Sequence, residues 1–538
     1  MKNTFYKQVK NLRDLANRFD KESNAAKNFI LKDMGSHKLS FTDALSSYHE
    51  TLLYIMAFPP DKKTFDLAEK EVLRMAEILK KQSEKVKDLF VNSGIPFSNY
   101  RAYFSHDCTR WLNAHPGCKV IIHDIENTMF DLNEVLKVTL PSLQRYATTA
   151  GFNNEELLNE LMPDKEIQLS YILNEISRLD DQPYIKDHYF DGLGMLIDII
   201  PKNKLFSKSF NRIDLPEVFY HDDLVKHFDV KDLLNRKLPP EAILSESSKK
   251  NLVQVIKNSM TITERETDPA TYLKEDSLRL FHLERGVSIA IYGMPQPRQL
   301  PMESYIGYTL FKNGMAATYG GGWIFGRRSD YALNIYDQFR GGESAYMVAQ
   351  ILRLYRQLFD INYFLAEASQ FGLDNPEGIA AGVFWFYYKL GFMPVDAQLN
   401  KLAKTEHQKN ISHNGYRSSE KTLLKFTESN IFLNLGKKVQ PGVFDITDKV
   451  KKMILKKYKG NSQHAEQECV TEFLIKTSCK DTFTKEEHEV LKEVSLWASA
   501  MNITDYSKIN NMLRMVKLKP ADEYRYQEQL RLFFEDAT

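Results

Sequence analysis

A glycine-rich turn offers the first recognisable chemistry. Arg340-Gly341-Gly342-Glu343-Ser344-Ala345 follows alternating apolar and polar residues (331–336) and precedes apolar residues at helical spacing (347–358), which predicts a strand, a turn and an amphipathic helix. The first turn of a helix presents free N–H groups and the positive end of the dipole, which suits a phosphate or pyrophosphate. Arg340 would add a charge-assisted contact. Two glycines before a helix are also common in plain connections, so the turn alone does not define a site.

A second motif follows this turn. Phe386-Tyr387-Tyr388-Lys389-Leu390-Gly391-Phe392 closes an aromatic-rich stretch (378–390) that is expected to form a single helix. The motif resembles the FYxKLGF signature of the GNAT superfamily of N-acetyltransferases, whose phosphate-binding turn usually reads Gln/Arg-x-x-Gly-x-Gly/Ala. Arg340 and Ala345 match the ends of that turn, whereas Glu343 stands where the middle glycine is usual. The resemblance covers residues 286–395, and it includes the order of the two motifs.

The resemblance implies an acyl-coenzyme A co-substrate, with acetyl-coenzyme A as the expected form, and no metal. In the family, backbone amides of the turn hold the pyrophosphate. The pantetheine arm runs along the preceding strand, whose N–H groups also polarise the thioester carbonyl. A carboxylate facing a pyrophosphate would be repelled, so either Glu343 points away or the turn is offset. The cofactor-binding residues implied here are Ile335, Tyr336, Arg340, Gly341, Gly342, Glu343, Ser344 and Ala345.

The resemblance also implies catalytic residues. Tyr387 would take the role of the family's tyrosine, which protonates the departing thiolate; the alternative is a core aromatic, because residues 384–388 are all aromatic. Glu367 and Asp337 are candidates for the base that deprotonates the amine, because each lies at the end of one of two strands expected to part. A surface carboxylate explains either residue equally well. Proton loss through water would need no base at all.

The elements around these motifs follow from the pattern alone. A strand is expected at 286–292, and a hairpin joins 303–311 to 315–325 through Asn313-Gly314, a strong signal for a type I′ turn. Gly320-Gly321-Gly322 interrupts the second arm, which predicts a bulge or the close approach of another group. Further strands are expected from 330 and at 361–366. The result is an antiparallel sheet with a crossover helix.

Composition limits the remaining possibilities. A chain of 538 residues predicts two to four domains, and 43% hydrophobic with 27% charged residues is typical of a soluble globular protein. A net charge of +1 gives no clear signal for nucleic acid. The N-terminus lacks the apolar core of a secretory signal, and no run reaches the roughly 18 apolar residues of a membrane span. Four sparse cysteines are interpreted as reduced thiols in a cytoplasmic protein.

The flanking regions carry weaker signals. Residues 1–95 have apolar stripes at helical spacing, and residues 96–268 are mixed and mainly helical. Three His-Asp pairs are possible metal ligands: His106-Asp107, His123-Asp124 and His221-Asp222. No second ligand recurs at helical spacing near any of them, so surface or capping roles are expected. Residues 399–538 are expected to be helical, with a capping box at Thr484 to Glu487.

The sequence therefore predicts an α+β protein. Its central mixed, mostly antiparallel sheet with crossover helices, similar to acyl-coenzyme A N-acyltransferases, is expected over 269–398, between helical regions at 1–95, 96–268 and 399–538. The predicted function is acyl transfer from a coenzyme A thioester to an amine, with a small molecule or a protein as acceptor. The alternative is a catalytically inactive ligand-binding or scaffold protein of the same fold, which the departure at Glu343 favours.

Overall fold

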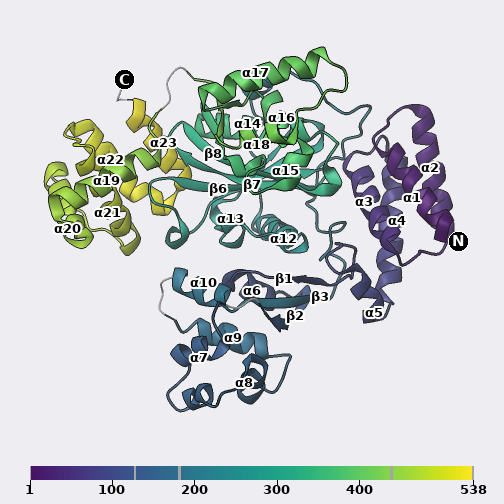
Figure 1. Cartoon of the computed structure of the whole chain (residues 1–538), viewed down its shortest axis with the longest axis horizontal. Helices are drawn as coiled ribbons and strands as arrows, with labels where there is room; N and C mark the ends of the chain where they lie inside the picture. The colour runs from purple at the N-terminus through teal and green to yellow at the C-terminus, as the bar shows by residue number, and fades with distance from the viewer. Residues whose placement is uncertain (1, 127–128, 180–182, 437–439, 536–538) are drawn as a thin grey trace.

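The computed structural model of the protein describes residues 2–126, 129–179, 183–436 and 440–535. It is an α+β structure with an eight-stranded mixed sheet and a separate three-stranded antiparallel sheet. In Figure 1 the large sheet occupies the centre, with the N-terminal helices on one side, the C-terminal helices on the other and the small sheet below.

The large sheet has the order β10-β11-β9-β8-β7-β6-β5-β4, and every neighbouring pair is antiparallel except β8 and β9. The strands that the sequence predicts between 286 and 366 are all present, so the antiparallel sheet with one crossover is confirmed. Its strands are β4 (Arg279–His282), β5 (Val287–Tyr292), β6 (Ser304–Lys312), β7 (Met315–Phe325), β8 (Arg328–Ile335), β9 (Tyr363–Ala366), β10 (Met393–Pro394) and β11 (Ile431–Asn434).

Local sequence explains the β6–β7 hairpin. Asn313 and Gly314 both have positive φ, 44° and 84°, as a type I′ turn requires. A Cβ at Gly320 would lie 2.1 Å from the carbonyl oxygen of Ala332, and a Cβ at Gly322 would lie 2.6 Å from the ring of Tyr355. These glycines therefore permit the close approach that the sequence predicts.

Helices cover both faces of the large sheet (Figure 1). The crossover helix α14 (Ser344–Phe359) joins β8 to β9, and the hydroxyl of its Tyr355 donates to the carbonyl of Ile306 at 2.6 Å. On the same side lie α15 (Pro376–Ala381), α16 (Val383–Lys389), α17 (Ala397–Ser412) and α18 (Glu420–Phe426). The other face carries α12 (Glu246–Ile262) and α13 (Asp268–Thr271), while α11 (Val230–Asn235) packs on α14.

Two details differ from the expected elements. The single helix expected over 378–390 is two short helices, because Gly382 adopts φ +65° between α15 and α16. The sheet also extends beyond residue 398, since β11 inserts between β9 and β10 and pairs with both.

The N-terminal helices share a hydrophobic core with the large sheet. Phe58, which follows α3, lies under the glycine turn, where a Cβ at Gly342 would be 2.7 Å from its ring. This region therefore supports the start of α14. Its helices are α1 (Lys2–Ala16), α2 (Lys21–Ser36), α3 (Asp43–Ala57), α4 (Lys62–Lys80) and α5 (Glu84–Lys87).

The small sheet has its own core. Its central strand is β3 (Met195–Pro201), between β1 (Tyr100–Ala102) and β2 (Cys118–Ile125). Arg298 connects this region to the large sheet by an ion pair of 2.9 Å with Asp107. The surrounding helices are α6 (His106–Asn113), α7 (Leu132–Thr139), α8 (Asn154–Leu161), α9 (Gln168–Ile176) and α10 (Pro183–Gly192).

The C-terminal helices form a third cluster, which includes Phe325 of β7 and Met302 from the segment before β6. Gln527 attaches this cluster to the sheet by donating to the carbonyl of Ile324 at 2.9 Å. The capping box predicted at Thr484 is present at the start of α21. The helices are α19 (Val443–Tyr458), α20 (Ser462–Thr477), α21 (Lys485–Ala500), α22 (Tyr506–Ala521) and α23 (Glu523–Glu535).

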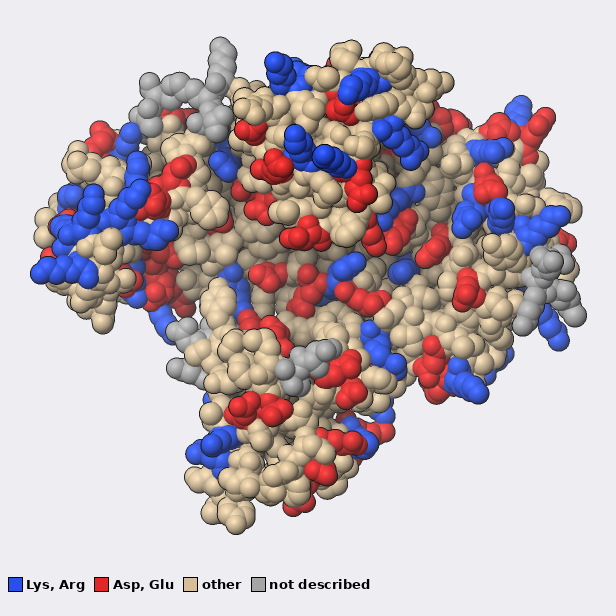
Figure 2. Space-filling view, viewed as in Figure 1, with Lys and Arg blue, Asp and Glu red and all other residues tan. Residues whose placement is uncertain are grey.

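Charges of both signs are interspersed over most of the face shown in Figure 2, with a denser group of Lys and Arg over the C-terminal helices. Within the described residues, no helix is both long enough and apolar enough to cross a membrane. All four cysteines are free thiols.

Candidate functional site

The two parallel strands β8 and β9 separate after a short contact. They pair only at Arg328 to Asp330 with Tyr363 to Leu365, and β8 then continues to Ile335 along a separate path. The edge of β8 beyond Asp330 thus lacks a neighbouring strand. The Leu333 N–H on this edge donates to the side-chain oxygen of Gln370 at 3.0 Å. A side chain therefore takes the place of a strand, and another amide-bearing group could replace it.

A cavity of about 410 Å³ opens where these strands separate. It runs from the edge of β8 to the start of α14 and is closed on the far side by α15 and α16. Arg340 and Glu377 are its charged lining residues, and the other polar groups are amides, hydroxyls and backbone. The lining consists of Leu333, Asn334, Ile335, Arg340, Ser344, Ser369, Gln370, Asn375, Glu377, Gly378, Ala381, Val383, Phe386 and Tyr387.

Arg340 and Ser344, at the two ends of the glycine turn, line one end of this cavity. Gly341 between them lines a neighbouring cavity. Gly341 is exposed with φ +82°, and no atom lies within 4 Å of the position of a Cβ. The backbone there is open to a close-lying ligand. Helix α14 begins at Ser344 without a side-chain cap, so its first N–H groups are available to an anion. Arg340 lies at the same place, and its guanidinium pairs with exposed Asp337 at 2.8 Å.

Glu343 is not part of the cavity lining, which corrects its predicted role as a cofactor contact. Its side chain is buried and accepts hydrogen bonds from Lys312 Nζ at 2.6 Å, from Arg285 Nε at 2.8 Å and from the Val225 N–H at 3.0 Å. The carboxylate thus points away from the turn. In this orientation the Glu343 carboxylate does not face a phosphate bound at the turn, so the electrostatic repulsion considered in the sequence analysis does not arise.

Tyr387 lines the cavity from α16. The residue is only 1% exposed, and burial raises the pKa of its hydroxyl further above neutral pH, where a tyrosine is already protonated. Burial also raises the pKa of the neighbouring Tyr331 hydroxyl. Tyr331 in turn accepts a hydrogen bond from Tyr308 at 3.3 Å. A protonated hydroxyl beside the separated strands can donate a proton to a ligand in the cavity.

The other predicted residues occupy different places. Ile335 and Ser344 line the cavity, while Gly342 and Ala345 are partly buried in the turn and the first helical turn. Tyr336 is a core residue that packs on Tyr319 with ring centroids 5.2 Å apart. Tyr336 therefore does not contribute a side chain to the cavity.

Neither candidate base lines this cavity. Glu367 is exposed at the end of β9. Asp337 lines a neighbouring cavity of about 250 Å³, between α1, α3 and the glycine turn, which Arg340 also lines. Neither carboxylate lies in the cavity with Tyr387. The structure therefore gives no support to either one as the base that deprotonates the amine.

Sequence reasoning missed four polar lining residues: Ser369, Gln370, Asn375 and Glu377. Asn375 precedes Pro376 and caps α15 by accepting from the Gly378 N–H at 2.9 Å, a signal that the sequence does contain. Gln370 has no such signal, because its partner Leu333 is distant in the sequence.

The histidine-aspartate pairs form no metal centre in the described part of the chain, where no group of three or more His, Cys, Asp or Glu side chains could hold an ion. His123 contacts Asp198 at 2.9 Å. His221 is buried beside Glu343 at 3.8 Å, and burial with the nearby Lys312 and Arg285 lowers its pKa to about 2.

Comparisons of the chain with protein-family models, with curated proteins and with solved structures find no match.

Proposed function

We propose that the protein transfers an acyl group from a coenzyme A thioester to an amine, with acetyl-coenzyme A as the expected donor. The observation that carries the proposal is the separation of β8 and β9 over a cavity that reaches the N-terminus of α14. A pantetheine arm carries amides that can replace Gln370 at the Leu333 N–H. Its pyrophosphate would lie at the glycine turn beside Arg340.

The chemistry needs little from the chain beyond positioning and one proton. The amine nitrogen attacks the thioester carbon, the carbon–sulfur bond breaks, and the thiolate takes a proton. Tyr387 is the proposed donor of that proton, because it lines the cavity where the thioester would lie. Backbone N–H groups of β8 would stabilise the oxyanion that forms during attack. The amine would lose its proton to water.

The resemblance to the GNAT superfamily supports the same proposal by a separate route, through Arg340, Ala345 and the motif around Tyr387. The Glu343 side chain points into the protein, toward Lys312. The glutamate in place of the usual glycine therefore no longer favours the alternative of an inactive ligand-binding or scaffold protein. The proposed acceptor is an amine of a small molecule or of a protein.

The test is calorimetric titration of the full chain with acetyl-coenzyme A and with a longer acyl-coenzyme A. Arg340→Glu should weaken binding by at least about tenfold, since it places a carboxylate at the pyrophosphate position. Arg514→Glu is the matched control, because Arg514 is exposed on α22, outside the cavity. Absence of binding by either thioester would overturn the proposal.

A further inference from the structure

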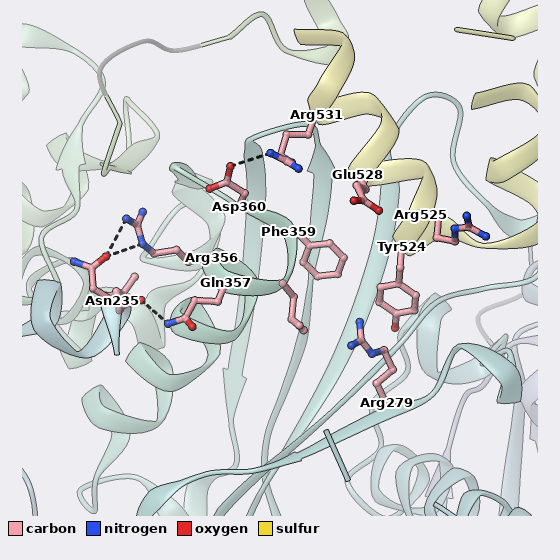
Figure 3. A pocket seen from close by; sticks show the side chains of 12 residues that line it. Asn235, Arg279, Arg356, Gln357, Phe359, Asp360, Tyr524, Arg525, Glu528 and Arg531 are labelled. Carbon is pink, nitrogen blue, oxygen red and sulfur yellow. Dashed lines mark hydrogen bonds and ion pairs between the residues drawn. The ribbon is translucent and has the colours of Figure 1, made fainter. Parts of the chain in front are cut away.

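A second and larger cavity, of about 700 Å³, lies at the opposite end of α14. Four segments that are far apart in the sequence meet there: the end of α11, strand β4, the end of α14 and helix α23. In Figure 3 Tyr524, Glu528 and Arg531 project from α23 across from Phe359 and Asp360, and Arg279 lies beneath Tyr524. The size is that of a cavity for a small organic ligand.

Arginines outnumber acidic side chains in the lining, where Arg279, Arg356, Arg525 and Arg531 accompany Asp360 and Glu528. Two of these arginines are already paired with carboxylates outside the lining, Arg279 with Glu241 at 2.6 Å and Arg531 with Glu535 at 2.9 Å. The charge of Asp360 is already compensated, because its carboxylate lies 2.7 Å from Arg327 and 3.7 Å from Arg531.

Arg356 is the cation most available to a ligand. Its described partners are neutral amide oxygens, those of Asn235 at 3.0 Å and Asn362 at 3.1 Å. These contacts hold the guanidinium in place without neutralising it. A preorganised guanidinium of this kind suits an oxyanion, with which it can form two parallel hydrogen bonds.

An aromatic wall lies beside the arginines. The rings of Phe359 and Tyr524 stack with centroids 5.7 Å apart and planes 12° apart, and the Tyr524 hydroxyl donates to the carbonyl of Ser277 at 2.8 Å. The guanidinium of Arg279 lies 5.1 Å from the centre of the Tyr524 ring. A fixed flat surface next to a cation suits a ligand that has both an apolar ring and a negative charge.

We propose that this cavity binds a small organic phosphate, with the phosphate on Arg356 and the organic part against Phe359 and Tyr524. The site is distinct from the glycine turn, because the 16 residues of α14 separate the two by about 24 Å. The proposal therefore does not depend on acyl transfer.

The test titrates ADP and inorganic pyrophosphate into the full chain carrying Arg340→Glu, which disfavours anion binding at the glycine turn. Both probes should bind with a stoichiometry of one, and ADP should bind more tightly because of its ring. Adding Arg356→Gln should weaken ADP binding by at least about tenfold. Arg514→Gln, an exposed arginine outside the cavity, should leave it unchanged.

A second variant tests the proposal by an increase in affinity, which a misfolded protein would not show. Glu528 has no ion-pair partner within 4 Å among the described residues and lines the same cavity, so its charge opposes an anion. Glu528→Gln should tighten ADP and pyrophosphate binding by about threefold or more. The proposal is overturned if neither probe binds at about 10 mM, or if binding is insensitive to both the arginine and the Glu528 changes.

Discussion

The carboxylate of Glu343 accepts a hydrogen bond of 2.6 Å from Lys312 Nζ, and both side chains are fully buried. Glu343 directly precedes α14, and Lys312 lies at the tip of the β6–β7 hairpin. Arg285 completes the cluster with an ion pair of 2.7 Å to the same carboxylate. This pairing fixes the start of α14 on the sheet and turns a carboxylate away from the cavity.

Removing the charge of Glu343 should destabilise the fold strongly. Glu343→Gln leaves the buried Lys312 without its counter-charge and Arg285 with only exposed Asp223 at 3.1 Å. The expected loss in free energy of unfolding is about 3–5 kcal/mol. Urea denaturation at pH 7 measures it. Arg340→Gln is the control, since its exposed pair with Asp337 should be worth less than about 1 kcal/mol. Similar losses for the two variants would contradict the structural role of Glu343.

His49 should make stability depend on pH. It is fully buried, its Nε2 lies 3.0 Å from Ser209 Oγ, and burial lowers its pKa to about 3. Between pH 6.5 and 3, the unfolded chain binds a proton at this histidine that the folded chain does not. The stabilising contribution of His49 therefore falls as the pH falls, by at most about 1.4 kcal/mol per pH unit.

The measurement for His49 is the difference in unfolding free energy between the wild type and His49→Gln. This difference should shrink by up to about 1.4 kcal/mol from pH 6.5 to pH 5.5. Burial raises the pKa values of Glu303 and Glu523 to about 7, and these groups favour folding as the pH falls. The wild type and His49→Gln both contain these two glutamates, so their contribution cancels in the difference between the two unfolding free energies. A difference that stays constant with pH would show that His49 has the same pKa in the folded and unfolded chains, against the lowered pKa that its burial causes.

Gln370→Ala should strengthen the binding of an acyl-coenzyme A, if the proposed function holds. Gln370 accepts the hydrogen bond of the Leu333 N–H, which a pantetheine amide would have to displace. Without this competitor, affinity should rise by about threefold, within the range of one neutral hydrogen bond. Calorimetry beside the wild type measures the change. Weaker binding would mean that Gln370 itself contacts the ligand.

Tyr387→Phe should slow acyl transfer by about a hundredfold, the usual size of a general-acid contribution. The ring remains in the core, so thioester affinity and thermal stability should stay close to those of the wild type. Tyr388→Phe is the control, because Tyr388 is the next residue and does not line the cavity. Equal rates for the two variants would remove Tyr387 from the mechanism.

Local patterns were sufficient to predict the central part of the fold. Asn313-Gly314 predicted its hairpin, and the glycines at 320–322 marked close packing that the structure bears out. The glycine turn that leads into α14 was also predicted. These features depend on neighbouring residues, which a sequence displays directly.

Long-range contacts account for what was missed. The direction of Glu343 depends on Lys312 and Arg285, which are 31 and 58 residues away. Strand β11 is only four residues long and lies in a polar region, so its pattern was too short to predict a strand. Gln370 entered the site only because β8 and β9 separate.

The insertion of β11 between β9 and β10 has a consequence for synthesis on the ribosome. β9 and β10 emerge first, yet neither pairs with the other, and each takes β11 as its neighbour. Until residue 434 has left the exit tunnel, the nascent chain carries β9 with an unpaired edge, and such edges invite association between chains. Completion of the central sheet is therefore delayed until a segment well beyond the glycine turn and Tyr387 has been translated.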